Sequence, residues 1–161
     1  MAESARASLR MDAGETARYL EAMTRAQVAT LNSDGSVHLV PMSYLLWDGE
    51  IGLWTDPGSR KVTNLRRDPR ITVLIEDGEQ FMQFRGLQVR GRAEIVDEPD
   101  RVRQAGEALF ARYRPDGLDD EARAQVAALV AVRVLVLVHG EATVSWDHAK
   151  LASGDLGEIG R

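Results

Sequence analysis

Cysteine is absent from the 161 residues of this sequence, and lysine occurs only twice, as Lys61 and Lys150. Without cysteine the chain can form no disulfide, no thiolate-bound zinc or iron–sulfur site and no thiol nucleophile. Any redox chemistry would therefore depend on a bound cofactor. The longest apolar stretch, around residues 126–138, is interrupted by Arg133, so neither a membrane span nor a signal peptide is indicated. We expect a cytoplasmic protein that binds no membrane.

A broad basic surface is also missing, since the net charge is −5. Proteins that bind nucleic acids usually carry a wide positive face, so nucleic-acid binding is disfavoured and any anion site must be local. An apolar content of 44% with 28% charged residues is typical of one soluble domain with a proper core. We expect a single domain over residues 1–151, followed by a flexible tail over residues 152–161 that is rich in glycine and acidic residues.

Turn signals between short β-prone runs dominate the first half of the sequence. A capping box from Asp12 to Glu15 predicts a first helix with apolar residues at helical spacing. The segments Asn32–Gly35 and Asp48-Gly49 then separate runs rich in Val, Leu and Thr, as in antiparallel hairpins. The expected elements are strands over 27–31, 36–47 and 50–55, a helix over 59–68 and a strand over 70–76.

The second half combines a long alternating strand with two helices. Residues 87–96 place apolar and polar side chains on opposite faces, which indicates a half-buried strand with residues 80–86 as its partner. Six or seven short strands joined mostly by tight turns predict a mainly β protein, an antiparallel barrel with peripheral helices. The remaining expected elements are helices over 99–113 and after Asp119, and β-structure over 131–138 and 143–146.

The most informative stretch is segment 59–70, which holds five basic residues against one acidic residue. Arg66 and Arg67 fall in the last turn of the expected helix, where cations face the negative end of the helix macrodipole and need no ligand. Arg60 and Lys61 fall in the first turn, where free backbone N–H groups already make the helix end positive. Two further cations at that position indicate a bound anion, and a phosphate would suit it.

Several motifs occur in an order that is specific to one superfamily. The segments Thr55–Lys61 and Asn64–Arg70 are followed by a strand, a turn and then Val89–Glu94. In this order the sequence resembles the pyridoxamine 5′-phosphate oxidase-related superfamily. The run Asn64–Arg70, together with Ser145–Asp147 near the C-terminus, is similar to the actinobacterial flavin/deazaflavin-dependent oxidoreductases. The resemblance covers residues 13–151.

The resemblance implies a homodimeric split β-barrel, with one cofactor in each of two equivalent clefts between the subunits. The implied activity is hydride transfer between a bound cofactor, the deazaflavin coenzyme F-420 or FMN, and a small organic substrate. F-420 is the first choice because the arginines past Lys61 could meet its acidic glutamyl tail. Neither a catalytic side chain nor a metal site is assigned. Carried over by position, the cofactor-binding residues are Pro41, Met42, Ser43, Trp54, Thr55, Ser59, Arg60, Lys61 and Asn64.

The segment His38–Tyr44 departs from the true pyridoxamine phosphate oxidases, because it contains no Arg or Lys that could bind the phosphate of the vitamin. Oxidation of vitamin B6 is therefore disfavoured. For Trp54, which precedes the phosphate motif, core packing and contact with the cofactor are equally compatible with the sequence.

A function of another class stays open, namely a non-catalytic protein that binds a flavin, haem or bilin in the same fold. A haem carrier would need an axial ligand, and His38 is the candidate because it is the only histidine on an expected core strand. His38, His139 and His148 lack the spacing of a zinc site and are interpreted as three unrelated surface or edge residues. The absence of Gly-x-Ser-x-Gly and phosphate-loop motifs disfavours hydrolases of those kinds.

Overall fold

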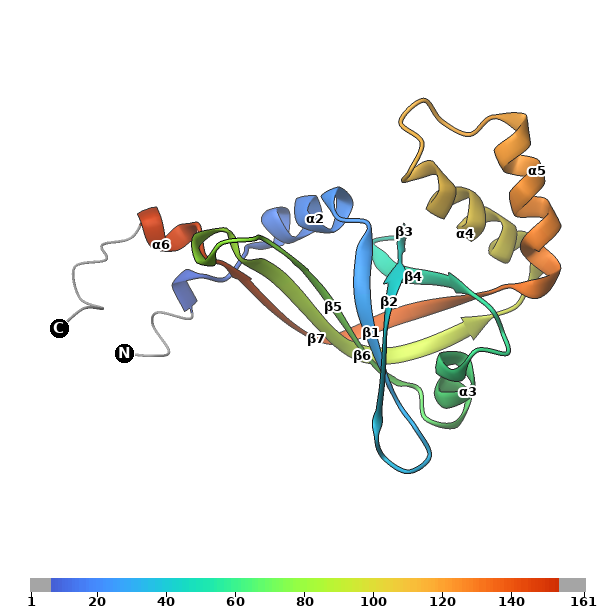
Figure 1. The fold of residues 1–161 in the computed structure, drawn as a ribbon, viewed down its shortest axis with the longest axis horizontal. Coiled ribbons are helices and arrows are strands. Elements are labelled where there is room, and N and C mark those ends of the chain that lie inside the picture. The colour runs from blue at the N-terminus through green and yellow to red at the C-terminus, as the bar shows by residue number, and fades with distance from the viewer. Residues whose placement is uncertain (1–6, 154–161) are drawn as a thin grey trace.

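The computed structural model describes residues 7–153 and contains one antiparallel β-sheet flanked by helices (Figure 1). The predicted flexible tail lies outside the described residues, except for Ala152 and Ser153 in helix α6. No helix within residues 7–153 has the length and apolar character needed to span a membrane. The strands are β1 (Arg25–Leu31), β2 (Val37–Ser43), β3 (Leu45–Trp47), β4 (Glu50–Thr55), β5 (Arg70–Asp77), β6 (Arg85–Val96) and β7 (Val134–Asp147). The helices are α2 (Ala13–Ala22), α3 (Arg60–Arg67), α4 (Pro99–Ala111), α5 (Asp120–Leu129) and α6 (Lys150–Ser153), with short 3-10 turns η1 (Phe81–Gln83) and η2 (Val130–Val132).

The sheet has two edges that are neighbours in sequence. Its strand order is β2-β1-β5-β6-β7-β4-β3, and only Tyr44 separates the edge strands β2 and β3. One residue can join both edges only if the sheet curls back on itself, as a barrel does. The curled seven-stranded sheet confirms the predicted mainly β, antiparallel split barrel.

The single strand predicted over 36–47 is wrong at Tyr44. Up to Ser43 the chain pairs with β1, and from Leu45 onward it pairs with β4. Tyr44 is fully buried, and its hydroxyl donates a hydrogen bond to the carbonyl of Leu20 at 2.6 Å. An apolar pattern predicts that a strand is buried but not which strand it pairs with. The sequence therefore does not reveal that the chain changes its pairing partner from β1 to β4 at Tyr44.

The predicted partner of strand 87–96 is also wrong. Residues 81–83 form η1, and β6 pairs instead with β5 on one side and β7 on the other. The connection from Asp77 to Arg85 carries Phe81, Met82 and Phe84, which resemble a strand in sequence but lie exposed. The strand predicted over 80–86 was therefore based on the apolar residues of a long connection.

Strand β7 is continuous where two separate segments were expected. Gly91 pairs with Gly140 and Arg90 with Ala142, so Glu141 is the extra residue of a β-bulge. A Cβ atom at Gly91 would lie 2.0 Å from the carbonyl oxygen of His139, so only glycine fits at this position. The gap expected between the two β-segments, at residues 139–142, is thus a β-bulge within one continuous strand.

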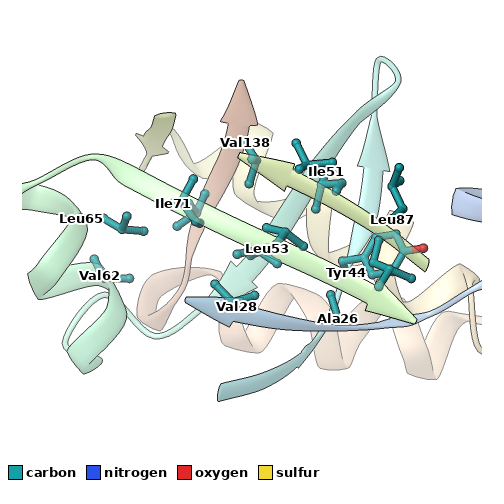
Figure 2. Packing of buried hydrophobic residues seen from close by; sticks show 14 of the residues in the cluster. Ala26, Val28, Tyr44, Ile51, Leu53, Val62, Leu65, Ile71, Leu87 and Val138 are labelled. Atoms are coloured by element: carbon teal, nitrogen blue, oxygen red, sulfur yellow. The ribbon is translucent and has the colours of Figure 1, made fainter. Parts of the chain in front are cut away.

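Two cores lie on opposite sides of β4 and β7. The inner side of the curled sheet encloses the larger core, which α3 closes with Val62 and Leu65 (Figure 2). Alternate residues of β7 enter different cores, which explains why Val134–Val138 reads as an unbroken apolar run. The second core lies beneath α4 and α5 and contains Leu45, Trp54, Val96, Val102, Ala105, Val126, Leu135 and Leu137.

Helix α2 is capped at both ends, but by different parts of the chain. The predicted capping box is confirmed, with Asp12 and Glu15 each accepting the other's backbone N–H at 2.7 Å. The last turn of α2 holds no basic residue of its own. Arg112, at the end of α4, instead donates to the carbonyls of Leu20 and Met23 and stacks over the ring of Tyr44 at 4.8 Å. A cation from α4 therefore serves the negative end of α2.

His139 joins three strands through two carboxylates, a contact that no spacing in the sequence indicates. Its Nδ1 lies 3.0 Å from Glu50 Oε1 on β4, and its Nε2 lies 2.8 Å from Glu94 Oε2 on β6. Hydrogen bonds to Glu50 and then Glu94 raise the pKa of His139 above its ordinary value of 6.5. Both ring nitrogens donate in the protonated form, so the imidazolium binds both carboxylates at once.

Replacing His139 by Gln should therefore remove a pH-dependent part of the stability. A histidine whose pKa is raised by folding stabilises the protein fully below the unfolded-state pKa of 6.5, and this contribution is lost as the pH rises through the higher folded-state pKa. The difference in unfolding free energy between the parent protein and His139→Gln should be larger at about pH 5.5 than at about pH 8.5. Urea unfolding at both pH values measures it. Parallel pH profiles for the parent protein and His139→Gln would contradict the expectation.

Candidate functional site

The nine residues assigned to the cofactor lie on three elements. Pro41, Met42 and Ser43 end β2, Trp54 and Thr55 end β4, and the other four lie in or just before α3. Helix α3 and helix α4 lie on different sides of the sheet, as Figure 1 shows. The structure therefore gathers the nine residues only in part.

The first turn of α3 is free to bind an anion. Ser59 is the N-cap residue, yet no side chain caps this helix. The Ser59 hydroxyl donates instead to the carbonyl of Asp56 at 2.8 Å, and the Gly58 N–H donates to Asp56 Oδ1 at 2.6 Å. The loop before α3 thus satisfies its own polar groups and leaves the helix N–H groups uncapped. Such an end attracts negative charge.

Lys61 is a half-buried cation at this helix end. Burial lowers its pKa, and the carboxylate of Asp56 partly opposes that shift. The side chains of Lys61 and Arg60 form no hydrogen bond or ion pair with another residue of segment 7–153. A half-buried ammonium without a partner is costly, and a phosphate would supply the missing hydrogen bonds.

Asn64 and the last turn of α3 hold the helix against the β1–β2 hairpin. The buried side-chain amide of Asn64 donates to Thr30 Oγ1 and to Asn32 Oδ1, both at 3.1 Å. Arg67 donates to the carbonyl of Leu31, and Arg66 donates to the carbonyl of Pro57 at 3.1 Å. The interpretation of these two arginines as cations that serve only the helix dipole is therefore incomplete, because each also ties α3 to a neighbouring loop or strand.

Trp54 and Thr55 point to opposite sides of β4, as successive strand residues must. Trp54 is 8% exposed and packs edge-to-face on Phe110 of α4, with ring centroids 6.1 Å apart. The guanidinium of Arg133 covers the same ring. The indole N–H of Trp54 is buried without a hydrogen-bond partner in the described chain. Trp54 thus packs in the core below α4, while Thr55 is the residue of this pair that faces the α3 side of the sheet.

The end of β2 presents two of its three candidate residues outward. Pro41 is exposed and Ser43 half-buried, whereas Met42 packs against the inner core, so only the backbone of Met42 is available to a ligand. Pro41 lies on an edge strand, which tolerates its missing N–H. The strand register continues this outer face across β2, β1, β5, β6 and β7. One row of neighbouring side chains is Pro41, Gln27, Leu74, Gln88 and Val144. The next row is Leu39, Ala29, Thr72, Arg90 and Ala142.

A groove of about 450 Å³ lies on the outer face, between Val37 and Leu31 on one side and Arg90 and Ala142 on the other. A second cleft of the same volume lies between α2 and the β3–β4 hairpin, and none of the nine candidate residues lines it. None of the nine candidate residues lines the groove either, but the groove borders the site, because Val37 at its rim lies on β2, the strand that also carries Pro41–Ser43. Within residues 7–153, no three His, Asp or Glu side chains converge as metal ligands.

One polar residue near the site gave no signal in the sequence. The hydroxyl of Tyr113, just after α4, donates to Ser43 Oγ at 2.6 Å. Seventy residues separate the two in sequence, and no motif links them. Only the docking of the end of α4 against β1 and β2 brings them together.

A seven-stranded sheet that curls into a half-barrel, with the long β6–β7 pair at its centre, defines a split-barrel protein. The chain belongs to the pyridoxamine 5′-phosphate oxidase family, whose model matches residues 13–137. This finding confirms the resemblance in the sequence. A comparison with curated proteins finds no match.

Solved structures support the same fold. The crystal structure of the conserved hypothetical protein Rv2991 from Mycobacterium tuberculosis is 39% identical and covers 91% of each chain with a TM-score of 0.87. A protein described as an F420 reductase is 28% identical and matches 74% of this chain and 88% of its own, with a TM-score of 0.56. HutZ, a heme storage protein from Vibrio cholerae, shares the fold at 15% identity, over 84% of this chain and 96% of its own, with a TM-score of 0.64.

Asn64→Ala should destabilise the protein, because it removes two hydrogen bonds that hold α3 on the β1–β2 hairpin. At about 0.5–1.5 kcal/mol for each bond, the expected loss in unfolding free energy is about 1–3 kcal/mol. Urea denaturation measures it, with Thr63→Ala on the exposed side of the same helix as the control. A loss no larger than that of the control would mean that Asn64 has no role in fixing α3.

Proposed function

We propose that the protein is an oxidoreductase that binds the deazaflavin coenzyme F-420, or alternatively FMN, with the cofactor phosphate on the first turn of α3. The observation that carries the proposal is the uncapped start of α3 beside Lys61, a half-buried cation whose side chain forms no hydrogen bond or ion pair within residues 7–153 and is influenced only at longer range by the carboxylate of Asp56. Both cofactors carry a phosphate group on the chain that extends from the ring, terminal in FMN and followed by the acidic tail in F-420, so the donor set fits either. The bound cofactor supplies the hydride chemistry, and the protein places it.

F-420 is preferred to FMN for two reasons. An F420 reductase is among the structures that this chain resembles. The coenzyme also carries an acidic tail, and Arg66 and Arg67 donate to backbone carbonyls and form no ion pair within residues 7–153, so both guanidinium groups can still attract an anion. Arg70 contributes less to this attraction, since it pairs with Asp68 at 2.6 Å.

We further propose that the active form is a homodimer. A ring that lies along Pro41–Ser43 rests on the outer face of the sheet, where it has one wall and open solvent opposite. Binding sites for small molecules usually cover most of the ligand, so a second wall is needed. A second copy supplies it at a two-fold interface, and exposed Leu39 and Val144 give that interface an apolar surface.

The alternative function is a carrier that binds a flavin, haem or bilin without turnover. It is supported by the shared fold of a heme storage protein. His38, the candidate axial ligand, is half-buried on the edge strand β2.

Titration of the purified protein with F-420 and with FMN, followed by quenching of ring fluorescence, tests the cofactor. Saturable binding of F-420 is expected, and tight FMN binding without any F-420 binding would make FMN the cofactor. The absorption spectrum of the protein as isolated tests the alternative, because a Soret band would favour the haem carrier.

Lys61→Ala should weaken cofactor binding by about 1.5–3 kcal/mol, or roughly tenfold to more than a hundredfold in Kd, the range for a hydrogen bond to a charged group. Stability should not fall, because the substitution removes a partly desolvated cation from the positive end of a helix. Fluorescence titration gives the affinity, and thermal unfolding gives the stability.

The matched control is Arg123→Ala, which removes one cation from α5 on a side chain that is 53% exposed. Arg66→Ala is unsuitable as a control, because Arg66 supports the loop before α3 through the Pro57 carbonyl. Unchanged affinity in Lys61→Ala for both cofactors, or plain unfolding of the variant, would refute the phosphate site.

Val144→Glu should convert the dimer into a monomer, because it places a charge in the centre of the outer face and opposes its burial. Light scattering at micromolar concentration is expected to give the mass of one chain, and cofactor affinity should fall with the dimer. Val132→Glu is the matched control, since Val132 is similarly exposed but lies on η2, away from that face. A parent protein that binds cofactor as a monomer would exclude the dimeric site.

A further inference from the structure

The cleft between helix α2 and the β3–β4 hairpin contains no residue of the proposed cofactor site. It is made of two cavities, of about 450 Å³ and about 260 Å³. The linings of both cavities include Thr16, Leu20, Gly49 and Thr143, so the two form one continuous cleft. The larger cavity alone lies within the range of roughly 300–1,000 Å³ that is typical of sites for small molecules.

The floor of this cleft is apolar and belongs to the inner side of the curled sheet. Ile51, Leu87, Val89 and Val138 line the smaller cavity and are members of the larger core. Thr143 lies directly opposite Val89 in the β6–β7 register, so the two side chains leave the same face of the sheet. Because the core packing fixes these side chains, the floor is already formed before a ligand arrives.

Helix α2 borders the cleft and is fixed at both ends (Figure 1). At its start, Lys150 of α6 donates to Glu15 Oε2 at 2.6 Å. At its end, Tyr44 and Arg112 both donate to the carbonyl of Leu20. The helix is therefore held at a set position across the cleft, and little ordering is left for a ligand to bring about.

The two ends of the cleft along α2 differ in charge. Arg10 lines the end before the helix, and its exposed side chain forms no hydrogen bond or ion pair within residues 7–153. Asp12 lines the same end, but its carboxylate already accepts the N–H of Glu15 at 2.7 Å. Glu21 lines the opposite end, about 14 Å from Asp12 at a helical rise of 1.5 Å per residue. An anion in the cleft is therefore attracted to Arg10 and repelled by Glu21.

We propose that this cleft binds a small amphipathic carboxylate, with the carboxylate group on Arg10 and the apolar body over the floor of the cleft. A guanidinium offers two parallel N–H donors, which match the two oxygens of a carboxylate. A neutral apolar molecule would gain the contact with the floor but not the contact with Arg10. The site is independent of the proposed function, because none of the nine cofactor candidates lines either cavity.

Isothermal titration calorimetry of the purified protein with octanoate and with octanol tests the site. Saturable binding of one octanoate per chain is expected, with octanol weaker by about twofold to fivefold, the effect of one exposed ion pair. Arg10→Gln should abolish this preference and leave the Kd of octanol unchanged. The matched control is Arg18→Gln, since Arg18 is an exposed cation of α2 that lines neither cavity, and it should leave both Kd values unchanged.

A bulky side chain placed in the cleft gives a second test that does not depend on charge. Thr143→Trp, from β7, and Ala17→Trp, from α2, should each raise the Kd of octanoate and of octanol by more than about tenfold, because the indole takes the space of the apolar body. Both positions are exposed, so the melting temperature should stay near that of the parent protein. The control Thr63→Trp adds the same bulk on the exposed side of α3 and should change neither Kd.

Parent protein that binds no octanoate would overturn the proposal, as would parent-like octanoate binding in folded Thr143→Trp or Ala17→Trp. Octanol binding as tight as that of octanoate, or equal losses in Arg10→Gln and Arg18→Gln, would overturn the assignment of the carboxylate to Arg10. Octanoate that competes with F-420 or FMN would lie in the cofactor site, which would refute a separate cleft site. Failure of the proposed function leaves a different result, because neither cofactor would then bind while octanoate still does.

Discussion

The connection of the two sheet edges through Tyr44 is the constraint on which the rest of the structure depends. Because β2 pairs with β1 and β3 pairs with β4, a single residue can span the edges only in a curled sheet. Tyr44 and Arg112 both donate to the carbonyl of Leu20, so the end of α2 and the end of α4 meet at this junction. The curl then defines an inner face that forms the larger core and an outer face that α4 and α5 cover in part with the second core.

The start of α3 illustrates how a binding site can be left open by the polar groups around it. Asp56 accepts hydrogen bonds from Gly58 and Ser59, and Arg66 holds the carbonyl of Pro57. The loop is therefore ordered without any side chain turning back to cap the helix. An anion that arrives at this end meets preorganised N–H groups and a half-buried ammonium, and little has to move.

Placing the ring segment on the outer face has a consequence for the whole molecule. The same rows of side chains that would lie under a cofactor extend across five strands and include exposed Leu39 and Val144. Ligand binding and self-association are thereby proposed for one continuous surface. At the rim of that surface the end of α4 brings Tyr113 to Ser43.

Local rules let the sequence by itself determine the capping box at Asp12, the hairpin turns, helix α3 with its cations, and the alternation of β6, because each depends on residues within a few positions of one another. The tertiary structure alone decided the exchange of strand partners at Tyr44, the bridging of Glu50 and Glu94 by His139, and the contact of Tyr113 with Ser43. The contacts of His139 and Tyr113 join residues 45 to 89 positions apart, and their formation depends on how the sheet curls. The candidate site divides in the same way: the cations at the start of α3 could be found from helix electrostatics, whereas the contact of Tyr113 with Ser43 depends on the end of α4 lying beside Thr24 and the end of β2.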